Sequence, residues 1–364
     1  MSTLGFMSKL IFLSLAFSIV SWSFFTPGNE VYAAKSVQRG SDSSDKSRRV
    51  ERVRRFYQRT LEDLNLSRQF TEEEIGELEK ESDSILPLDS PQREADLLSL
   101  QDTYYSYLDW LKDRIEEFEG DMDQLSGNDL PGSDFLENSF EEMVTSLKEM
   151  EKVLKEKINR FDSEEKRIAG ILERRRSLQL RFSDLEIRLE RIEKHLDDKQ
   201  QDASKGENRA ERVRTDLRVI QTELQSLPTV DESILKHYKL MTEWGKGEAD
   251  WIALKIDEYS MLRQIAPLLP RDTIRFASEL DKAIRMTVRS YENEITSVKR
   301  KIDGLERSRS EVTHVGTLRE TERSRELDDF YQRAQLKYND FMNRLKIRIG
   351  AWQAEEAEIK SVKP

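Results

Sequence analysis

The chain has 364 residues, of which 36% are Asp, Glu, Lys or Arg, while glycine and proline number only 14 and 8. This composition is typical of long solvated helices and disfavours a compact α/β enzyme. The formal net charge of −11 disfavours general nucleic-acid binding, because phosphates would repel the chain. The absence of cysteine from the sequence excludes disulfides and cysteine-based catalytic or metal sites.

The N-terminus contains an uncharged apolar run over residues 10–25, preceded by Lys9. We expect a signal peptide over residues 1–33, cleaved after Ala33, and hence export, with the periplasm as the destination. The alternatives are an uncleaved inner-membrane anchor and a buried cytoplasmic helix. The run spans about 24 Å as a helix, which is shorter than a hydrocarbon core of about 30 Å. Membrane contact is expected only through residues 10–25, and only if the signal stays uncleaved.

Residues 34–48 are serine-rich and charged, and they predict a flexible basic tether. Residues 35–55 contain eight Lys or Arg against three acids. This basic segment either touches anionic lipid or polysaccharide, or is a solvated linker followed by the first turns of a helix. We favour the solvated linker.

Residues 49–125 predict an N-terminal helical region. A short helix ends near Leu64, and Thr71 with Glu74 resembles a capping box that opens a second short helix. A third helix begins at Pro91 and runs to about Leu125. Its apolar surface is wider than one seam, which indicates burial on several sides or contact with another protein. The aromatic residues proposed to form that partner face are Tyr104, Tyr105, Tyr107 and Trp110.

An apolar heptad pattern keeps one phase through residues 134–227. Twenty-one of its twenty-six stripe positions are apolar, against 37% hydrophobic residues in the whole chain. A repeat of about 3.5 residues that persists this long predicts a coiled coil. The expected seam comprises Leu147, Leu154, Phe161, Ile168, Ile171, Leu178, Phe182, Leu185, Leu189, Ile192 and Leu196.

The rod is interrupted in composition near residues 201–208. Continuous phase favours a straight helix, whereas the polar stretch and Gly206 favour a turn or kink. The turn is the preferred interpretation. Three polar residues, Lys157, Glu164 and Arg175, lie on the seam, where they either fix register or mark a solvated stretch.

Charges flank the seam in a regular order. Arg160, Arg181 and Arg188 each precede an acid by five residues, which is the spacing that a parallel dimer pairs. The rod is therefore expected to self-associate in parallel or to pack on a helix of its own chain with acidic flanks. The remaining possibility is that these charges only solvate a lone amphipathic helix.

The C-terminal third predicts a helix over residues 231–266 with Asp231 as its cap, a helical pair over 272–353 and a tail over 354–364. Trp244 and Trp251 favour core packing over a ligand cage. The last helix carries basic residues beside an aromatic stripe, a pattern that a membrane-surface helix would also show; these are Lys337, Arg344, Lys346 and Arg348. Acidic residues share its polar face, so we favour bundle packing.

No catalytic or metal motif stands out in the sequence. The three histidines, His195, His237 and His314, are dispersed, and the phosphate-loop and nucleophile-elbow patterns are missing. We therefore expect an all-α protein of elongated antiparallel helical hairpins or a bundle with a long coiled coil, without cofactor or enzyme activity.

The expected role is a scaffold or adaptor of the bacterial cell envelope that binds protein, itself or an envelope partner, through helices. The alternative is a periplasmic regulator of an envelope enzyme or channel. In layout the chain resembles the export-signal-plus-coiled-coil segments of mechanosensitive channels and murein-hydrolase activators. That resemblance is architectural, and no residue role is transferred from it.

Overall fold

A computed structural model describes residues 41–85, 91–125, 133–198, 203–269, 272–312 and 318–362. Within these ranges the protein is all-α, as the sequence predicts, and contains no strand. The expected signal peptide over residues 1–33 lies outside the described residues. The chain divides into two compact units between Asp45 and Lys46, and the arrangement below concerns the larger unit, from Lys46 onward.

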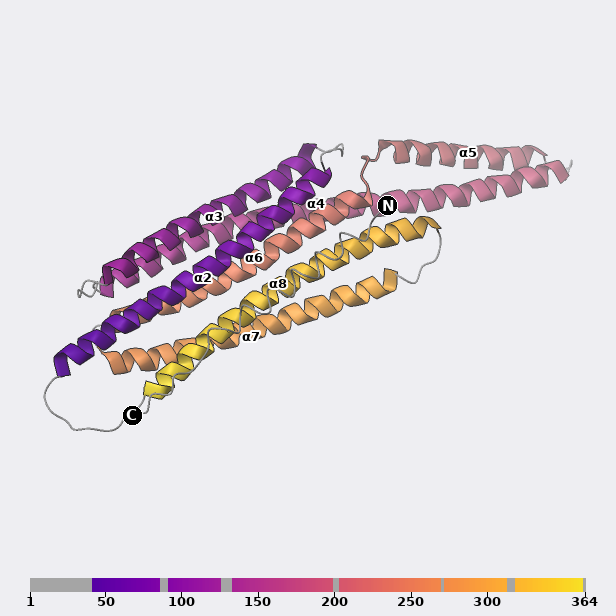
Figure 1. The fold of residues 1–364 in the computed structure, drawn as a ribbon. Coiled ribbons are helices and arrows are strands. Elements are labelled where there is room, and N and C mark those ends of the chain that lie inside the picture. The colour runs from indigo at the N-terminus through magenta and orange to yellow at the C-terminus, as the bar shows by residue number, and fades with distance from the viewer. Residues whose placement is uncertain are drawn as a thin grey trace, which may run out of the picture. The chain divides into compact units, whose positions relative to one another are not determined.

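Seven α-helices and one 3-10 turn make up the described chain (Figure 1). In chain order they are α2 (Ser41–Ile85), α3 (Pro91–Gln124), α4 (Ser133–Asp198), α5 (Ala203–Ser226), α6 (Glu232–Ile265), η2 (Ala266–Leu268), α7 (Thr273–Val312) and α8 (Leu318–Val362). The predicted cap of α6 is present, because the Asp231 carboxylate accepts a hydrogen bond from the Ile234 amide at 2.9 Å.

Neighbouring helices are mostly antiparallel, as their contacts show. Tyr57 near the start of α2 packs on Phe118 near the end of α3, with ring centroids 5.2 Å apart. Arg114 on α3 reaches Glu142 on α4, 3.3 Å away. Tyr291 in the middle of α7 donates a hydrogen bond to Glu258 near the end of α6. Short connections between long helices favour this arrangement.

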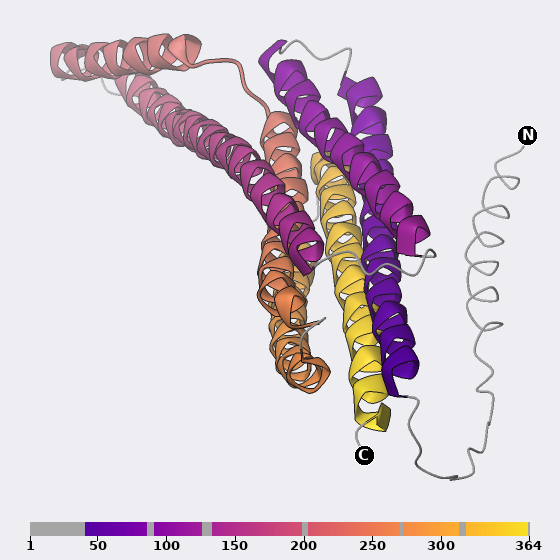
Figure 2. The ribbon, with the colours of Figure 1, turned by 90° about the vertical axis from the view of Figure 1, so that its left-hand side faces the viewer.

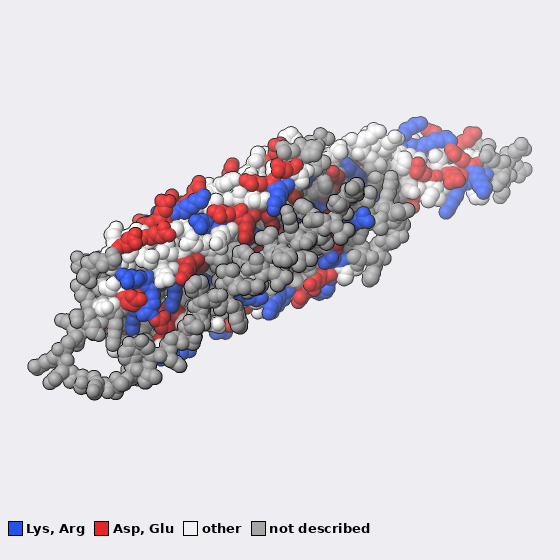
Figure 3. All heavy atoms as spheres, in the orientation of Figure 1, with Lys and Arg blue, Asp and Glu red and all other residues white. Residues whose placement is uncertain are grey.

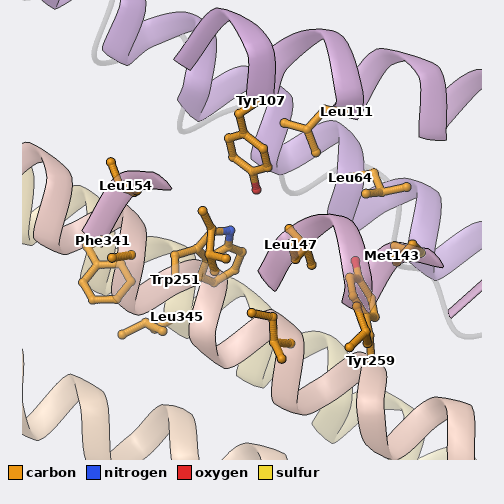
Figure 4. Packing of buried hydrophobic residues seen from close by; sticks show 14 of the residues in the cluster. Leu64, Tyr107, Leu111, Met143, Leu147, Leu154, Trp251, Tyr259, Phe341 and Leu345 are labelled. Carbon is orange, nitrogen blue, oxygen red and sulfur yellow. The ribbon is translucent and has the colours of Figure 1, made fainter. Parts of the chain in front are cut away.

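Helix α6 is the centre of the bundle. Its Trp251 is completely buried, and α2, α3, α4, α7 and α8 all contribute side chains to the same apolar cluster. Figure 4 shows Trp251 surrounded by Tyr107 from α3, Leu147 from α4 and Phe341 from α8. Trp244 is buried as well, so both tryptophans serve the core, as the sequence favoured.

Helices α4 and α6 lie close together at Gly245. A Cβ atom added there would lie 2.8 Å from Ile158 Cγ1, which is closer than real contacts allow. The glycine therefore lets the two backbones meet, and the chain uses no phosphate-binding glycine loop here. Antiparallel α4 and α6 together form the most extensive interhelical contact of the bundle.

Helix α2 corrects the two-helix prediction for residues 49–85. It runs unbroken from Ser41, so residues 41–48 of the expected tether are also helical. Thr71 does not cap a new helix; its hydroxyl donates to the Ser67 carbonyl at 2.8 Å within the same helix. A threonine satisfied in this way by the preceding turn is compatible with a helix interior.

Helix α8 likewise extends through most of the predicted tail, to Val362. Its last turns carry Glu355 and Glu358, which form ion pairs with Arg59 and Arg55 of α2. Arg55, the last base of the basic N-terminal segment, is thus paired with a carboxylate of the same chain at a partly exposed position.

Candidate functional site: a buried ion network and a projecting arm

A cluster of charged side chains lies in the bundle interior between α2, α6 and α8. Asp63 on α2 forms an ion pair with Lys255 on α6, and Arg348 on α8 binds the Glu258 carboxylate in a bidentate manner. All four residues are buried. The Tyr259 hydroxyl donates to Asp63 at 3.0 Å, so the cluster is hydrogen-bonded as well as charge-paired.

The environment of Glu258 decides its protonation. Burial opposes ionisation, but the positive charges of Arg348 and Lys255, with hydrogen bonds from Arg348 and Tyr291, outweigh burial and lower the Glu258 pKa to about 2. Burial, together with the neighbouring Arg348, lowers the pKa of Lys255 against the attraction of its two carboxylate partners. Glu258 is therefore the fixed negative charge around which the cationic groups are arranged.

A second cluster lies further along the same three helices. Arg344 on α8 reaches Glu248 on α6 at 2.8 Å and Glu74 on α2 at 3.1 Å. Lys337 also pairs with Glu74. The Arg344 guanidinium lies over the Phe70 ring, 4.5 Å from its centroid, which adds a cation–π contact. One face of α2 thus supplies carboxylates to one face of α8.

A third group surrounds the start of α6. Asp96 on α3 accepts a hydrogen bond from the Tyr238 hydroxyl at 2.9 Å and pairs with Arg160 of α4. The buried His237 has its Nδ1 atom 3.5 Å from Glu81 of α2. Burial lowers the His237 pKa more than the nearby carboxylates raise it, so the ring is neutral at pH 7.

The chemistry of these clusters suits groups that fix the register of the helices against one another. In the first two clusters the carboxylates face cations, and both the acidic and the basic side chains are buried. Buried ion pairs add little net stability, but removing one partner is strongly destabilising, which disfavours any other alignment of the helices. Within the described residues, no group of three His, Asp or Glu side chains is placed to hold a metal ion.

A cavity lies between α3, α4 and α6 beside the second cluster. Thr103, Tyr107, Met150 and Ile252 line it together with Glu248, and it has room for little more than water. No helix in the described ranges combines the length and apolar character that a membrane span requires.

The predicted seam of α4 has two different environments. In the bundle it is covered by α6, and the buried members are Leu147, Leu154, Phe161 and Ile168. Leu178 is buried as well, but it lies beyond the bundle, where α5 is the neighbouring helix. Beyond the bundle only α5 covers the seam, and the half-buried members are Ile171, Phe182, Leu185, Leu189, Ile192 and Leu196. In both regions the helix that contacts the seam belongs to the same chain.

The far half of α4 and α5 form an antiparallel arm. Arg174 pairs with Glu223, and Glu193 pairs with Arg214 at 2.7 Å, so the pairing runs in opposite directions. The chain reverses between Asp198 and Ala203, and residues 203–208, which composition assigned to a turn, are helical. Figure 2 shows the arm continuing past the ends of the other helices of this unit.

Arg175 holds the base of the arm. Its guanidinium donates to the carbonyls of Pro228, at 2.6 Å, and Val230, at 2.9 Å, in the connection between α5 and α6. The other polar seam residues are also used locally: Lys157 binds Ser99, and Glu164 pairs with Arg167 at 2.8 Å.

The proposed aromatic partner face divides between core and surface. Tyr104 and Tyr107 are buried, so they cannot contact a partner in this fold. Trp110 is half-buried and stacks on Tyr107 with centroids 5.8 Å apart. Only Tyr105, with 40% of its surface exposed, remains on the outside, where its hydroxyl donates to Glu79.

The comparisons with known proteins give no guide to this site. No protein-family model matches the chain, and neither the curated proteins nor the solved structures yield a match. The function is therefore argued from the geometry alone.

Proposed function

We propose that this protein is a non-enzymatic scaffold or adaptor of the bacterial cell envelope, whose α4–α5 arm engages another protein. The observation that supports this proposal is the half-buried seam of the arm, from Phe182 to Leu196. Two helices cannot fully cover an apolar seam of this width, and a partner helix would complete the coiled coil that the heptad pattern predicts.

The bundle supplies a stiff base for such an arm. Its helices are aligned by buried ion pairs as well as by apolar packing, and Arg175 fixes the connection at which the arm leaves it. Residues 176–198 would reach about 35 Å at 1.5 Å per helical residue. A rigid projection of that length suits a protein that bridges two others.

The location in the envelope is proposed from the N-terminal apolar run and the absence of cysteine from the sequence. Export to the periplasm is the preferred location, and an uncleaved anchor through residues 10–25 is the alternative. Cell fractionation with N-terminal sequencing of the isolated protein tests this part. A chain that begins at Ala34 in a periplasmic fraction supports export, whereas an intact N-terminus in the cytosol contradicts it.

The arm is tested by site-specific photo-crosslinking in cells. A photoreactive amino acid replaces Phe182 or Leu189 on the half-buried seam, and a matched variant carries it at Tyr291 in the bundle core. The arm positions are expected to give one discrete crosslinked species that the core position lacks. Only intramolecular products at both arm positions would contradict the proposal.

A regulator of an envelope enzyme or channel is the second candidate. It is favoured by exposed Leu98 and Tyr105, seven residues apart on α3. A crosslink from Tyr105 to a single enzyme or channel at one-to-one stoichiometry would favour this role over the scaffold.

A further inference from the structure

Helix α3 presents an acidic outer surface. Seven acids on it are exposed, against one exposed base, Lys112. Exposed positions follow one another at alternating steps of four and three residues, so they form a single straight stripe. Figure 3 shows these red side chains gathered along the upper edge of the molecule, over α3. The exposed acids are Glu94, Asp102, Asp109, Asp113, Glu116, Glu119 and Asp123.

Helix α7 presents a surface of the opposite sign. Seven of its exposed side chains are basic and three are acidic, and from Ile274 to Ser290 the described exposed side chains include four bases and no acid. Ile274 and Met286 are also exposed there, by 85% and 63%. The exposed bases are Arg275, Lys282, Arg285, Arg289, Lys299, Arg300 and Arg307.

The two stripes lie on opposite edges of the bundle. Figure 1 places α3 and α7 at its two margins, with α2, α6 and α8 between them. One molecule therefore cannot close its own acidic stripe on its own basic stripe. Two different surfaces that are complementary in charge produce a head-to-tail contact, which extends into a chain of molecules when rotation does not close it.

The charges also match in detail. Helices α3 and α7 run antiparallel within one molecule. When two copies are related by translation, α3 of one copy therefore lies antiparallel to α7 of the other. Setting Tyr105 of one copy opposite Met286 of the next pairs the exposed apolar side chains. The same register pairs Asp102 with Arg289, Asp109 with Lys282, Lys112 with Glu279, and Glu116 with Arg275.

We propose that this protein assembles head to tail, the acidic stripe of α3 docking on the basic stripe of α7 in a second copy. The inference rests on the proposed scaffold role and names its partner as another molecule of the same chain. It uses surfaces distant from the α4–α5 arm, so loss of assembly would leave the arm crosslinks in place, and loss of the crosslinks would leave assembly in place.

The test measures molecular mass by sedimentation velocity for the protein as isolated from cells. The mass is expected to rise with concentration beyond that of a dimer, and to fall to the monomer as ionic strength increases from about 50 mM to about 500 mM. Asp102→Lys/Asp109→Lys/Glu116→Lys on α3, and Arg275→Glu/Lys282→Glu/Arg289→Glu on α7, are each expected to be monomeric at low salt.

Mixing the two triple variants makes the test specific. In the mixture, the native stripe of one variant meets the native stripe of the other, and the two reversed stripes are complementary as well, so the mixture is expected to regain extended assembly of alternating variants. The sixfold variant, in which both stripes are reversed, should regain extended assembly. Reversing three exposed acids on the arm, Glu173, Asp184 and Glu190, changes the net charge equally and should leave assembly intact.

Circular dichroism on each variant separates lost assembly from lost folding, and the rescue by mixing requires both variants to be folded. The proposal is overturned if the native protein stays monomeric at low salt. It is also overturned if either triple variant assembles as the native chain does, or if the mixture of the two folded variants stays monomeric.

Discussion

The buried charges make individual residues of this bundle unusually sensitive to substitution. Arg348 from α8 and Tyr291 from α7 reach Glu258 because of the bundle fold, whereas Lys255 lies one turn before it on α6. A residue in such a network stabilises the correct alignment mainly because its loss leaves another charge unpaired.

Replacing Glu258 with Gln should lower the free energy of unfolding by about 3–5 kcal/mol, because Arg348 then lies buried without its counter-charge. Replacing Glu258 and Arg348 together with Met should cost far less than Glu258→Gln alone. Urea unfolding measures both. Glu292→Gln on the exposed face of α7 is the control and should change stability by less than about 0.5 kcal/mol. Equal losses in the single and double variants would contradict a paired role.

The acid dependence follows from the same residue. The Glu258 pKa falls from 4.5 to about 2 on folding, so its contribution is complete above pH 4.5 and disappears as the pH falls toward 2. The stability difference between the native chain and Glu258→Gln should therefore be constant at neutral pH and narrow below pH 4.5. If the stability difference widened in acid, the Glu258 pKa would be raised on folding and not lowered.

Asp121 at the end of α3 should behave in the opposite way. Burial and the adjacent Glu117 raise its pKa from 3.8 to about 6, so its ionised form destabilises the folded state. Asp121→Asn should then raise the free energy of unfolding at pH 7 by about 1 kcal/mol after solvent screening. The gain should vanish as the pH falls from 6 to 4. Asp113→Asn, on the exposed face, is the control and should change stability at pH 7 by less than about 0.5 kcal/mol.

At the scale of helices, the close contact of α4 and α6 at Gly245 depends on a missing side chain. Gly245 lies within α6, where an alanine would ordinarily stabilise the helix by about 1 kcal/mol. The added Cβ would instead meet Ile158 of α4 at 2.8 Å. This contact between the helices, and not helix propensity, therefore decides whether the substitution stabilises or destabilises the protein.

Gly245→Ala should lower the melting temperature, whereas Gly304→Ala in α7 should raise it, because no atom lies within 4 Å of its added Cβ. Thermal unfolding followed by circular dichroism compares the two. Ile158→Ala, which removes the opposing Cγ1 atom, should cost less stability in the Gly245→Ala background than in the native chain. Stabilisation by Gly245→Ala would mean that α4 and α6 are further apart.

At the scale of the whole molecule, the α4–α5 arm is built to fold as a separate extension. Helix α5 packs mainly on α4, and the base of the arm is anchored by Arg175 and by Arg176, whose guanidinium lies 3.7 Å from Glu232. The bundle core draws on α4 only up to about Leu172.

Deleting residues 180–226 and joining the ends with a short Gly-Ser linker should leave the bundle folded. The mean residue ellipticity should change little, and one cooperative unfolding transition should remain, because the core residues around Trp251 are untouched. The deletion should also abolish the arm crosslinks while preserving the head-to-tail assembly. Loss of the cooperative transition would show that the arm is integral to the bundle.

Much of the helix content could be predicted from the sequence, since proline-free stretches and the heptad pattern depend on local chemistry. The predicted break at Thr71 was wrong because a hydroxyl bonded to the preceding turn and a capping hydroxyl look alike in sequence. The sequence also did not distinguish the buried basic residues of α8 from the exposed one. Lys337, Arg344 and Arg348 are buried while Lys346 is exposed, and only the position of α2 and α6 distinguishes them.

The sequence by itself determined that this protein is all-α, where most of its long helices lie, and which stripe of α4 is apolar and has to be buried. These features depend on backbone propensity and apolar periodicity, which act over a few residues. The tertiary structure decided what covers that stripe and which charges are buried. Glu74 meets Arg344 across 270 residues of sequence, and Glu248 meets the same guanidinium across 96. Such pairs arise only from the way the helices are packed, so no local sequence pattern predicts them.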